Sequence, residues 1–348
     1  KTVGSALSIG DRVEGNWRDQ GQWYNGVVDK VTETAESVCH VAIAYDDGDY
    51  EADVPPVRVR RAESSSTPDA AEPGAGVTAL HVAARRGCTE AVLALLSAGA
   101  AVDARTRRGV TPLLMAAEAG AELETVVALL DAHASESAVH AEGDTPLMGA
   151  AMGDHTHVVV ELLKRGASVN QARADGMTAL MAAARHGHHA SASLLVEAKA
   201  DPGMRRSSVS AAERSLLIQT EFTALHFACR YGHTQVAAIL VEAGAEIDPR
   251  SRSGWSPLQY AGQFGHTDAL RGMIKLGADV NHLGDGGWHA LFDACMNGHD
   301  ESVLALLVAG ANVNASRDNG FNGLLFAAQN GHVDAARAMA RHGADLEK

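Results

Sequence analysis

The sequence has few aromatic residues and few cysteines, and each shortage excludes a class of protein. Aromatic residues make up only 4% of the 348 residues, whereas the hydrophobic fraction is 46%. This balance favours packed helices with small side chains over a β-sandwich. The four cysteines lie far apart, with no C-x-x-C spacing. They indicate reduced thiols in an intracellular compartment, nuclear or cytoplasmic, and argue against a disulfide framework or a zinc knuckle.

Long apolar runs and positive charge are also lacking. No apolar stretch approaches the roughly 20 residues that a bilayer span requires, so we expect no membrane insertion. The formal net charge of −14 repels phosphate backbones, which argues against general nucleic-acid binding and favours basic or amphipathic proteins or peptides as partners. The chain starts at Lys1 rather than Met. This predicts a trimmed fragment, in which a missing signal peptide excludes little.

Catalytic and cofactor-binding motifs are missing as well. The sequence contains no nucleophile elbow, phosphate-cradling glycine loop, kinase signature or HExxH motif. The densest histidine cluster, His186–His189, has no cysteine or aspartate near it in the sequence to complete a zinc site. We therefore predict a protein that is not an enzyme and that binds no cofactor or metal.

Residues 77–348 are built from a repeated unit. Its first three residues are Thr78-Ala-Leu, Thr111-Pro-Leu, Thr145-Pro-Leu, Thr178-Ala-Leu, Thr223-Ala-Leu, Ser256-Pro-Leu, His289-Ala-Leu and Asn322-Gly-Leu, at spacings of 33, 34, 33, 45, 33, 33 and 33. Each unit continues with an Ala-rich helix, a Gly-His-type turn and a second helix that is followed by Gly-Ala. The pattern resembles the ankyrin repeat in eight copies. The resemblance implies helix pairs joined by hairpin-like loops and stacked into a curved solenoid.

The chemistry of the unit agrees with this resemblance. No single unit can bury both faces of its helices, so neighbouring units must supply the core. The hydroxyl group at the head of a unit can cap the first helix. The histidines of the Gly-His turn and of the Thr-x-Leu-His position are expected to be structural and to bond to neighbouring units. His289 and Asn322 replace the hydroxyl, so the last unit is either a loose end-cap or is followed by more chain.

The interval of 45 residues contains an insertion, which predicts an extended loop at about 201–221. The run Arg205-Arg206-Ser207-Ser208 resembles a basophilic-kinase site with Ser208 as the phosphate acceptor. Alternatively, the apolar Ser215–Gln219 segment docks onto the stack and covers the mismatch.

The first 61 residues differ in character from the repeats. Five short segments rich in Val, Tyr and Trp predict strands: 12–17, 22–31, 39–45, 50–54 and 57–60. The patterns G-D-x-V, W-Y-x-G-x-V and Y-D-D-G-D-x-E resemble a Tudor domain. The expected fold is thus mostly α, an ankyrin-repeat solenoid (77–348) preceded by a linker (62–76) and a small five-stranded Tudor/SH3-like β-barrel (9–61).

The Tudor resemblance implies an aromatic cage for methylated lysine or arginine. The matching positions are Trp17, Tyr24, Tyr45 and Tyr50, with one acid of the Asp46–Asp49 run, for which we choose Asp47, at the rim. Ring faces attract a methylated ammonium group through their quadrupole, so a methylated histone-like tail is the expected ligand. Two alternatives are that the rings pack the barrel interior, and that the acids form a calcium loop, although the bidentate Glu of such a loop is missing.

A column of aromatic residues precedes the heads of the last four units. This ladder position holds Val77, Val110, Asp144 and Met177, and then Phe222, Trp255, Trp288 and Phe321. The resemblance places it where the hairpin meets the first helix, on the concave side. We expect these aromatics, with Tyr231 and Phe264, to form an exposed stripe that lines a protein-binding groove within 222–331. The alternative is that they pack against adjacent hairpins.

The leading hypothesis is therefore a non-enzymatic interaction scaffold, in which a reader of methylated basic tails is joined to an ankyrin array that binds a second protein. One alternative is a pure adaptor with a structural barrel. Another is the regulatory fragment of a larger enzyme, such as a ligase or a kinase.

Overall fold

The computed structural model divides into two units, Lys1–Ala75 and Gly76–Lys348. It describes the strand backbone of residues 12–15, 24–33, 39–45, 50–54 and 59–61 in the first unit. It describes the backbone and side chains of residues 76–206, 221–317 and 320–347 in the second unit.

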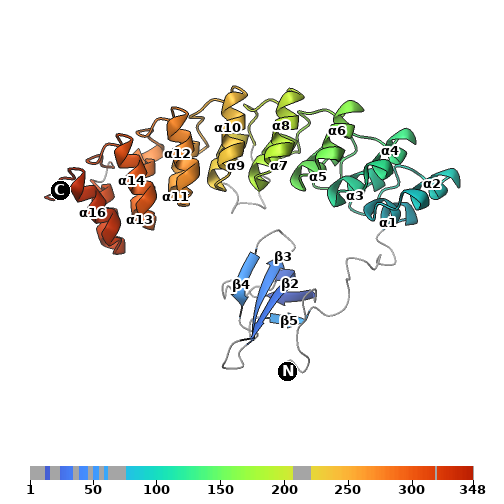
Figure 1. The fold of residues 1–348 in the computed structure, drawn as a ribbon, viewed down its shortest axis with the longest axis horizontal. Helices are drawn as coiled ribbons and strands as arrows, with labels where there is room; N and C mark the ends of the chain where they lie inside the picture. The colour runs from blue at the N-terminus through green and yellow to red at the C-terminus, as the bar shows by residue number, and fades with distance from the viewer. Residues whose placement is uncertain are drawn as a thin grey trace. The chain divides into compact units, whose positions relative to one another are not determined.

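The described backbone of the first unit forms an antiparallel sheet. Its strands are β1 (Arg12–Gly15), β2 (Tyr24–Glu33), β3 (Cys39–Tyr45), β4 (Tyr50–Val54) and β5 (Val59–Arg61), in the order β4-β3-β2-β1-β5 (Figure 1). These strands overlap the five segments expected from the sequence. Closure into a barrel and the likeness to a Tudor domain stay predictions.

The described part of the second unit consists of paired helices. The pairs are α1 (Ala79–Arg85) and α2 (Thr89–Ser97); α3 (Pro112–Ala119) and α4 (Leu123–Asp131); α5 (Pro146–Met152) and α6 (Thr156–Lys164); α7 (Ala179–His186) and α8 (His189–Glu197); α9 (Ala224–Arg230) and α10 (Thr234–Glu242); α11 (Pro257–Gln263) and α12 (Thr267–Lys275); α13 (Ala290–Asn297) and α14 (Asp300–Val308); α15 (Gly323–Asn330) and α16 (Val333–Arg341). A short 3₁₀ turn, η4 (Asp285–Gly287), precedes α13. None of these helices is long and apolar enough to span a bilayer.

The helix pairs stack side by side into a curved solenoid (Figure 1). Each odd-numbered, inner helix packs against the next inner helix, and the even-numbered, outer helices do the same along the other side. One apolar core runs through all eight repeats, from Leu80 in α1 to Met339 in α16. The mostly helical repeat solenoid expected from the sequence is confirmed.

A buried imidazole ties two repeats together at the start of α9. The backbone N–H of Thr223 donates to Nδ1 of His226 over 3.1 Å, and Nε2 lies 3.1 Å from the carbonyl oxygen of Trp255 in the next repeat. Because Nδ1 accepts, Nε2 carries the proton and the ring is neutral. Burial lowers the pKa of His226 to about 3. His81 makes the same two bonds at α1, where Nε2 lies 3.0 Å from the carbonyl oxygen of Val110.

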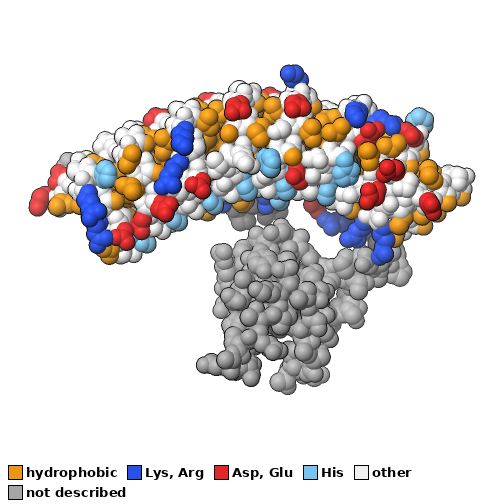
Figure 2. All heavy atoms as spheres, viewed as in Figure 1, with side chains coloured by type: hydrophobic (Ala, Val, Ile, Leu, Met, Phe, Trp, Pro, Cys, Tyr) orange, Lys and Arg blue, Asp and Glu red, His pale blue; other side chains and the backbone are white. Residues whose placement is uncertain are grey.

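Histidines at the turn inside each repeat bond in the opposite direction, to the preceding repeat. Nε2 of His188 lies 2.8 Å from the carbonyl oxygen of Met152, and the same contact recurs at His155, His233, His299 and His332. Several of these rings lie against a glycine of the preceding repeat: a Cβ added at Gly187 would come within 2.5 Å of His233 Nδ1, and one added at Gly265 within 2.5 Å of His299 Nδ1. Histidine side chains recur along the solenoid face seen in Figure 2. The structural role expected for these histidines is confirmed.

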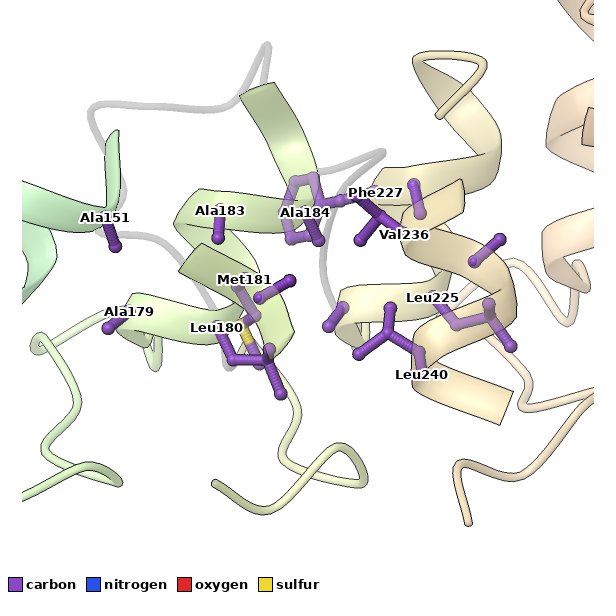
Figure 3. Packing of buried hydrophobic residues seen from close by; sticks show 14 of the residues in the cluster. Ala151, Ala179, Leu180, Met181, Ala183, Ala184, Leu225, Phe227, Val236 and Leu240 are labelled. Atoms are coloured by element: carbon purple, nitrogen blue, oxygen red, sulfur yellow. The ribbon is translucent and has the colours of Figure 1, made fainter. Parts of the chain in front are cut away.

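The 45-residue interval leaves the stack intact, because α7 packs directly on α9. Figure 3 shows the two repeats meeting there, with Ala184 next to Phe227. The backbone N–H of Arg206 donates to the carbonyl oxygen of Phe222 over 2.8 Å, and that of Glu221 donates to Arg206 over 2.7 Å. The inserted chain therefore leaves and re-enters the hairpin at one point. Residues 207–220, including Ser208 and the apolar segment, lie outside the described residues.

Replacing His226 by Gln should keep the bridge between repeats and remove its sensitivity to acid. Gln259 already makes the equivalent bonds in α11, from Oε1 to the Ser256 N–H (2.9 Å) and from Nε2 to the Trp288 carbonyl oxygen (3.0 Å). The folded pKa of His226, about 3, lies below the ordinary 6.5. The unfolded chain therefore takes up this proton first, and stability falls as the pH drops from 6.5 towards 3.

Between pH 7 and pH 5 we expect His226→Gln to lose less free energy of unfolding than the wild type, by at most about 2 kcal/mol, in urea titrations. His189→Gln, at an exposed histidine of α8, is the control and should follow the wild type. Parallel pH profiles for His226→Gln and the wild type would show that the imidazole does not carry this effect.

Candidate protein-binding groove

The aromatic ladder residues each close a hairpin directly before an inner helix. The carbonyl oxygen of Trp255 accepts the N–H of Ser251 over 2.9 Å, and that of Trp288 accepts the N–H of Gly284 over 2.7 Å. Both carbonyl groups also receive the side-chain bridges from the preceding repeat. The ladder backbone is thus fixed from two sides, and only the side chains are free to differ between repeats.

Phe222 does not belong to an exposed stripe, and the expectation that it would is wrong. Its side chain is fully buried, with 0% exposed. The ring stacks on His226 at 4.9 Å between centroids and meets Phe227 and Tyr260 edge-on at 5.3 and 4.8 Å. Tyr260 belongs to the next repeat, so Phe222 is part of the interface between repeats. At this ladder position the aromatic ring packs against the neighbouring repeat, which was the alternative to an exposed stripe.

Trp255 and Trp288 are half-buried, and they flank a pocket. Their ring centroids lie 6.2 Å apart, tilted by 48°. The pocket has a volume of about 580 Å³. It is lined by Arg252, Ser253, Trp255, Tyr260, Gln263, Asp285 and Trp288. It runs along α11 from the hairpin before the helix to its last residue, which makes a cleft with aromatic walls and polar groups at its rim.

The other predicted groove residues lie outside this pocket lining. Phe321 is 37% exposed, and its ring centroid lies 5.4 Å from that of Phe326. Tyr231 and Phe264 follow the last residues of α9 and α11, at the opposite helix end from the ladder. Phe264 is 40% exposed and lies under the guanidinium of Arg230, at 4.4 Å. The six predicted residues are thus distributed over a core position (Phe222), a tryptophan pocket, an exposed ladder position (Phe321) and the far ends of two inner helices.

Sequence reasoning missed Tyr260, which contributes a wall of the pocket and contacts Trp255 at 5.3 Å. Its position, four residues after the head of the unit, also holds Phe227 and Phe326. These aromatic residues recur with the same period as the ladder, so the repeat period could have revealed them in the sequence. It lies on the inner helices directly behind the hairpins.

The same column holds, in the seventh repeat, an acid without a hydrogen-bonding partner. Asp293 is fully buried, and within residues 221–317 and 320–347 neither carboxylate oxygen has a partner. Burial raises the pKa of Asp293 well above its usual value, against the opposing charge of Arg317. Nearby His289 is also buried and lowered in pKa, to about 4. Burial thus disfavours the charged form of both side chains.

A cluster in the second and third repeats has the side chains for a cation site. His140, Glu142 and Asp144 place one ligand atom each within 4.8 Å of the others. Arg173 lies 3.4 Å from Asp144, and Arg108 pairs with Glu142. These arginines neutralise the two carboxylates, and His140 bonds Asp144 at 3.1 Å. The cluster serves as an ion-pair network between hairpins, and we assign no metal to it.

The cage and the phosphorylation site predicted from the sequence are not tested by these contacts. Trp17, Asp47 and Ser208 lie outside the described residues. Tyr24, Tyr45 and Tyr50 lie on strands β2, β3 and β4, where Tyr45 is paired with Gly26 and Tyr50 with Ala44.

The two arginines next to Ser208 are engaged within the solenoid. Nε and Nη2 of Arg206 donate to Asp175 Oδ2 at 3.0 and 2.8 Å, and Arg205 donates to the carbonyl oxygen of Arg250. A kinase that recognises these two arginines would have to break these hydrogen bonds.

Truncating the two ends of the ladder should give unequal losses of stability. Phe222→Ala removes a fully buried ring and should lower the free energy of unfolding by about 3–5 kcal/mol. Phe321→Ala, at the same repeat position but 37% exposed, should cost about 1 kcal/mol. Urea unfolding of the two variants measures the difference, and equal losses would disprove the division of the ladder into core and surface.

Comparison with known proteins identifies the repeat. A family model described as ankyrin repeats (3 copies) matches residues 62–138, 113–206 and 209–283, and a second, described as ankyrin repeats (many copies), matches residues 291–340. No curated protein matches the chain. The matches cover most of the sequence and coincide with the stacked helix pairs. The chain belongs to the ankyrin-repeat family.

Proposed function

We propose that this protein is a non-enzymatic interaction scaffold whose tryptophan pocket receives a protein partner. Ankyrin repeats form protein-interaction scaffolds. The observation that favours this pocket is the pair of half-exposed indoles, Trp255 and Trp288, on either side of a cleft. Aromatic side chains contribute disproportionately to binding energy when a partner desolvates them. Trp255 and Trp288 are the two tryptophans of residues 77–348, whose other apolar side chains are mostly Ala, Leu and Val.

Two features support the pocket as a preformed site. The backbone of each tryptophan is bonded within its own hairpin and to the preceding repeat. The ring of Trp288 is further held by Phe326, stacked at 5.5 Å. A partner would therefore meet walls already in place, which lowers the entropy lost on binding.

The double substitution Trp255→Ala with Trp288→Ala should remove partner binding by the full-length chain. We expect at least a tenfold drop in the proteins captured on the immobilised chain, measured by quantitative mass spectrometry. Because both rings are half-buried, unfolding should also become easier, by about 1–3 kcal/mol.

Met177→Ala is the matched control for that loss of stability. Met177 occupies the ladder position of the fourth repeat and is 6% exposed, so its truncation destabilises the stack without touching the pocket. It should retain the captured proteins. If the double tryptophan variant retained them equally well, the pocket would not be the binding site.

We infer in addition that the first unit binds methylated lysine or arginine on a basic tail. The sequence pattern supports this, together with the placement of Tyr24, Tyr45 and Tyr50 on three adjoining strands. With one ligand in each unit, linked binding would raise the overall affinity through effective concentration. A methylated histone-like tail would imply a nuclear protein. A pure adaptor, or the regulatory fragment of a ligase or kinase, is the alternative.

A titration of the full chain with trimethyl-lysine and dimethyl-arginine peptides tests the reader function. We expect binding in the micromolar range that weakens about tenfold for the unmethylated peptide and for Tyr45→Ala. Trp255→Ala with Trp288→Ala should leave this binding unchanged. Equal affinity for methylated and unmethylated peptides would leave the first unit a structural domain.

A further inference from the structure

The charged residues of the solenoid are divided unevenly between its two sides. The eight outer helices carry ten acidic and five basic side chains. The inner helices carry three arginines and two acids, Glu118 and Asp293. Burial raises the pKa of both acids, that of Glu118 to about 7. The inner helices are therefore less acidic than the outer helices.

One arginine of the pocket lining and two arginines that contact aromatic rings near it have no carboxylate partner among the described residues. Arg252 lines the pocket and is exposed. Arg317 lies 4.2 Å above the Trp288 ring, and Arg230 lies 4.4 Å above Phe264 and 5.9 Å from Tyr260. Within the described part of the solenoid, none of the three forms an ion pair. Arg108, Arg173 and Arg206, by contrast, are all paired with acids.

Arg252 is exposed at the pocket, and Arg317, whose Nε donates to the carbonyl oxygen of Gly286 over 3.2 Å, keeps its terminal nitrogens for an anion. A guanidinium that lies on an aromatic ring uses its face for that contact, and its N–H groups point outward from the edge. In that geometry an arginine can donate two parallel hydrogen bonds to a carboxylate. Among the described residues at the cleft, Arg252 and Arg317 stand against one acid, Asp285, so positive charge exceeds negative charge there.

We propose that the groove formed by Trp255, Tyr260 and Trp288 binds an acidic protein segment that carries a large apolar or aromatic anchor. The anchor enters between the indoles, and carboxylates on either side of it pair with Arg252 and Arg317. The cleft of about 580 Å³ is larger than one side chain and leaves room for the segment's backbone. The inference rests on the proposed function, because it specifies the partner of the same pocket. It reverses the basic partner expected from net charge.

Selection from a library of random 12-residue displayed peptides, with the full chain as bait, tests the inference. We expect the enriched peptides to combine Asp or Glu with Trp, Phe or Leu. The most enriched peptide, synthesised with a fluorophore, should bind about tenfold more weakly to Arg252→Gln. Arg271→Gln makes the same change in net charge on outer helix α12 and should bind like the wild type.

The outcomes separate the two proposals. Peptides that depend on Trp255 and Trp288 but are basic or neutral would overturn the acidic partner and keep the pocket. Peptides insensitive to both tryptophans, or no enrichment at all, would overturn the pocket itself. Competition by 12-nucleotide single-stranded DNA as strong as that of the unlabelled peptide would overturn the protein segment in favour of a nucleic acid.

Discussion

Every repeat of this solenoid depends on the apolar interface with its neighbours. The helices are seven to nine residues long, below the roughly 12–15 residues at which an isolated helix becomes even marginally stable in water. A pair of such helices has too little surface to enclose a core, so its apolar face is buried only against the adjoining pairs. Stability is therefore distributed along the stack, and a change in one repeat is felt mainly by the next.

Hydrogen bonds between repeats give this apolar stack its register. Buried histidines bond forward to the next hairpin at the start of α1 and α9, and the turn histidines bond backward to the preceding inner helix. Both sets end on backbone carbonyl groups, which are present whatever the side chain. The surface side chains can then vary while the spacing between repeats is held. Gln259 shows that an amide can replace the imidazole at this position.

The repeat period predicts where a residue lies within its unit, but it cannot predict how closely the neighbouring unit covers it. The helix pairs, the capping threonines and the histidine roles all follow from position alone. Phe222 and Trp255 share one position, yet the first is fully buried and the second half-buried, because Tyr260 covers one ring and forms a pocket with the other. Net charge has the same limitation, since it averages over the acidic outer helices and over inner helices that carry three arginines and two acids.

The insertion between the fourth and fifth repeats begins and ends at residues that are hydrogen-bonded to each other. Two backbone hydrogen bonds, Arg206 to Phe222 and Glu221 to Arg206, close the hairpin at its base, and α7 and α9 meet as if the extra chain were not there. Loop-closure entropy grows only slowly with length. Segments of other lengths and compositions can accordingly be exchanged between Arg206 and Glu221 while the helical array keeps its register. Relatives can diverge in length at this site, and a foreign epitope can be grafted there.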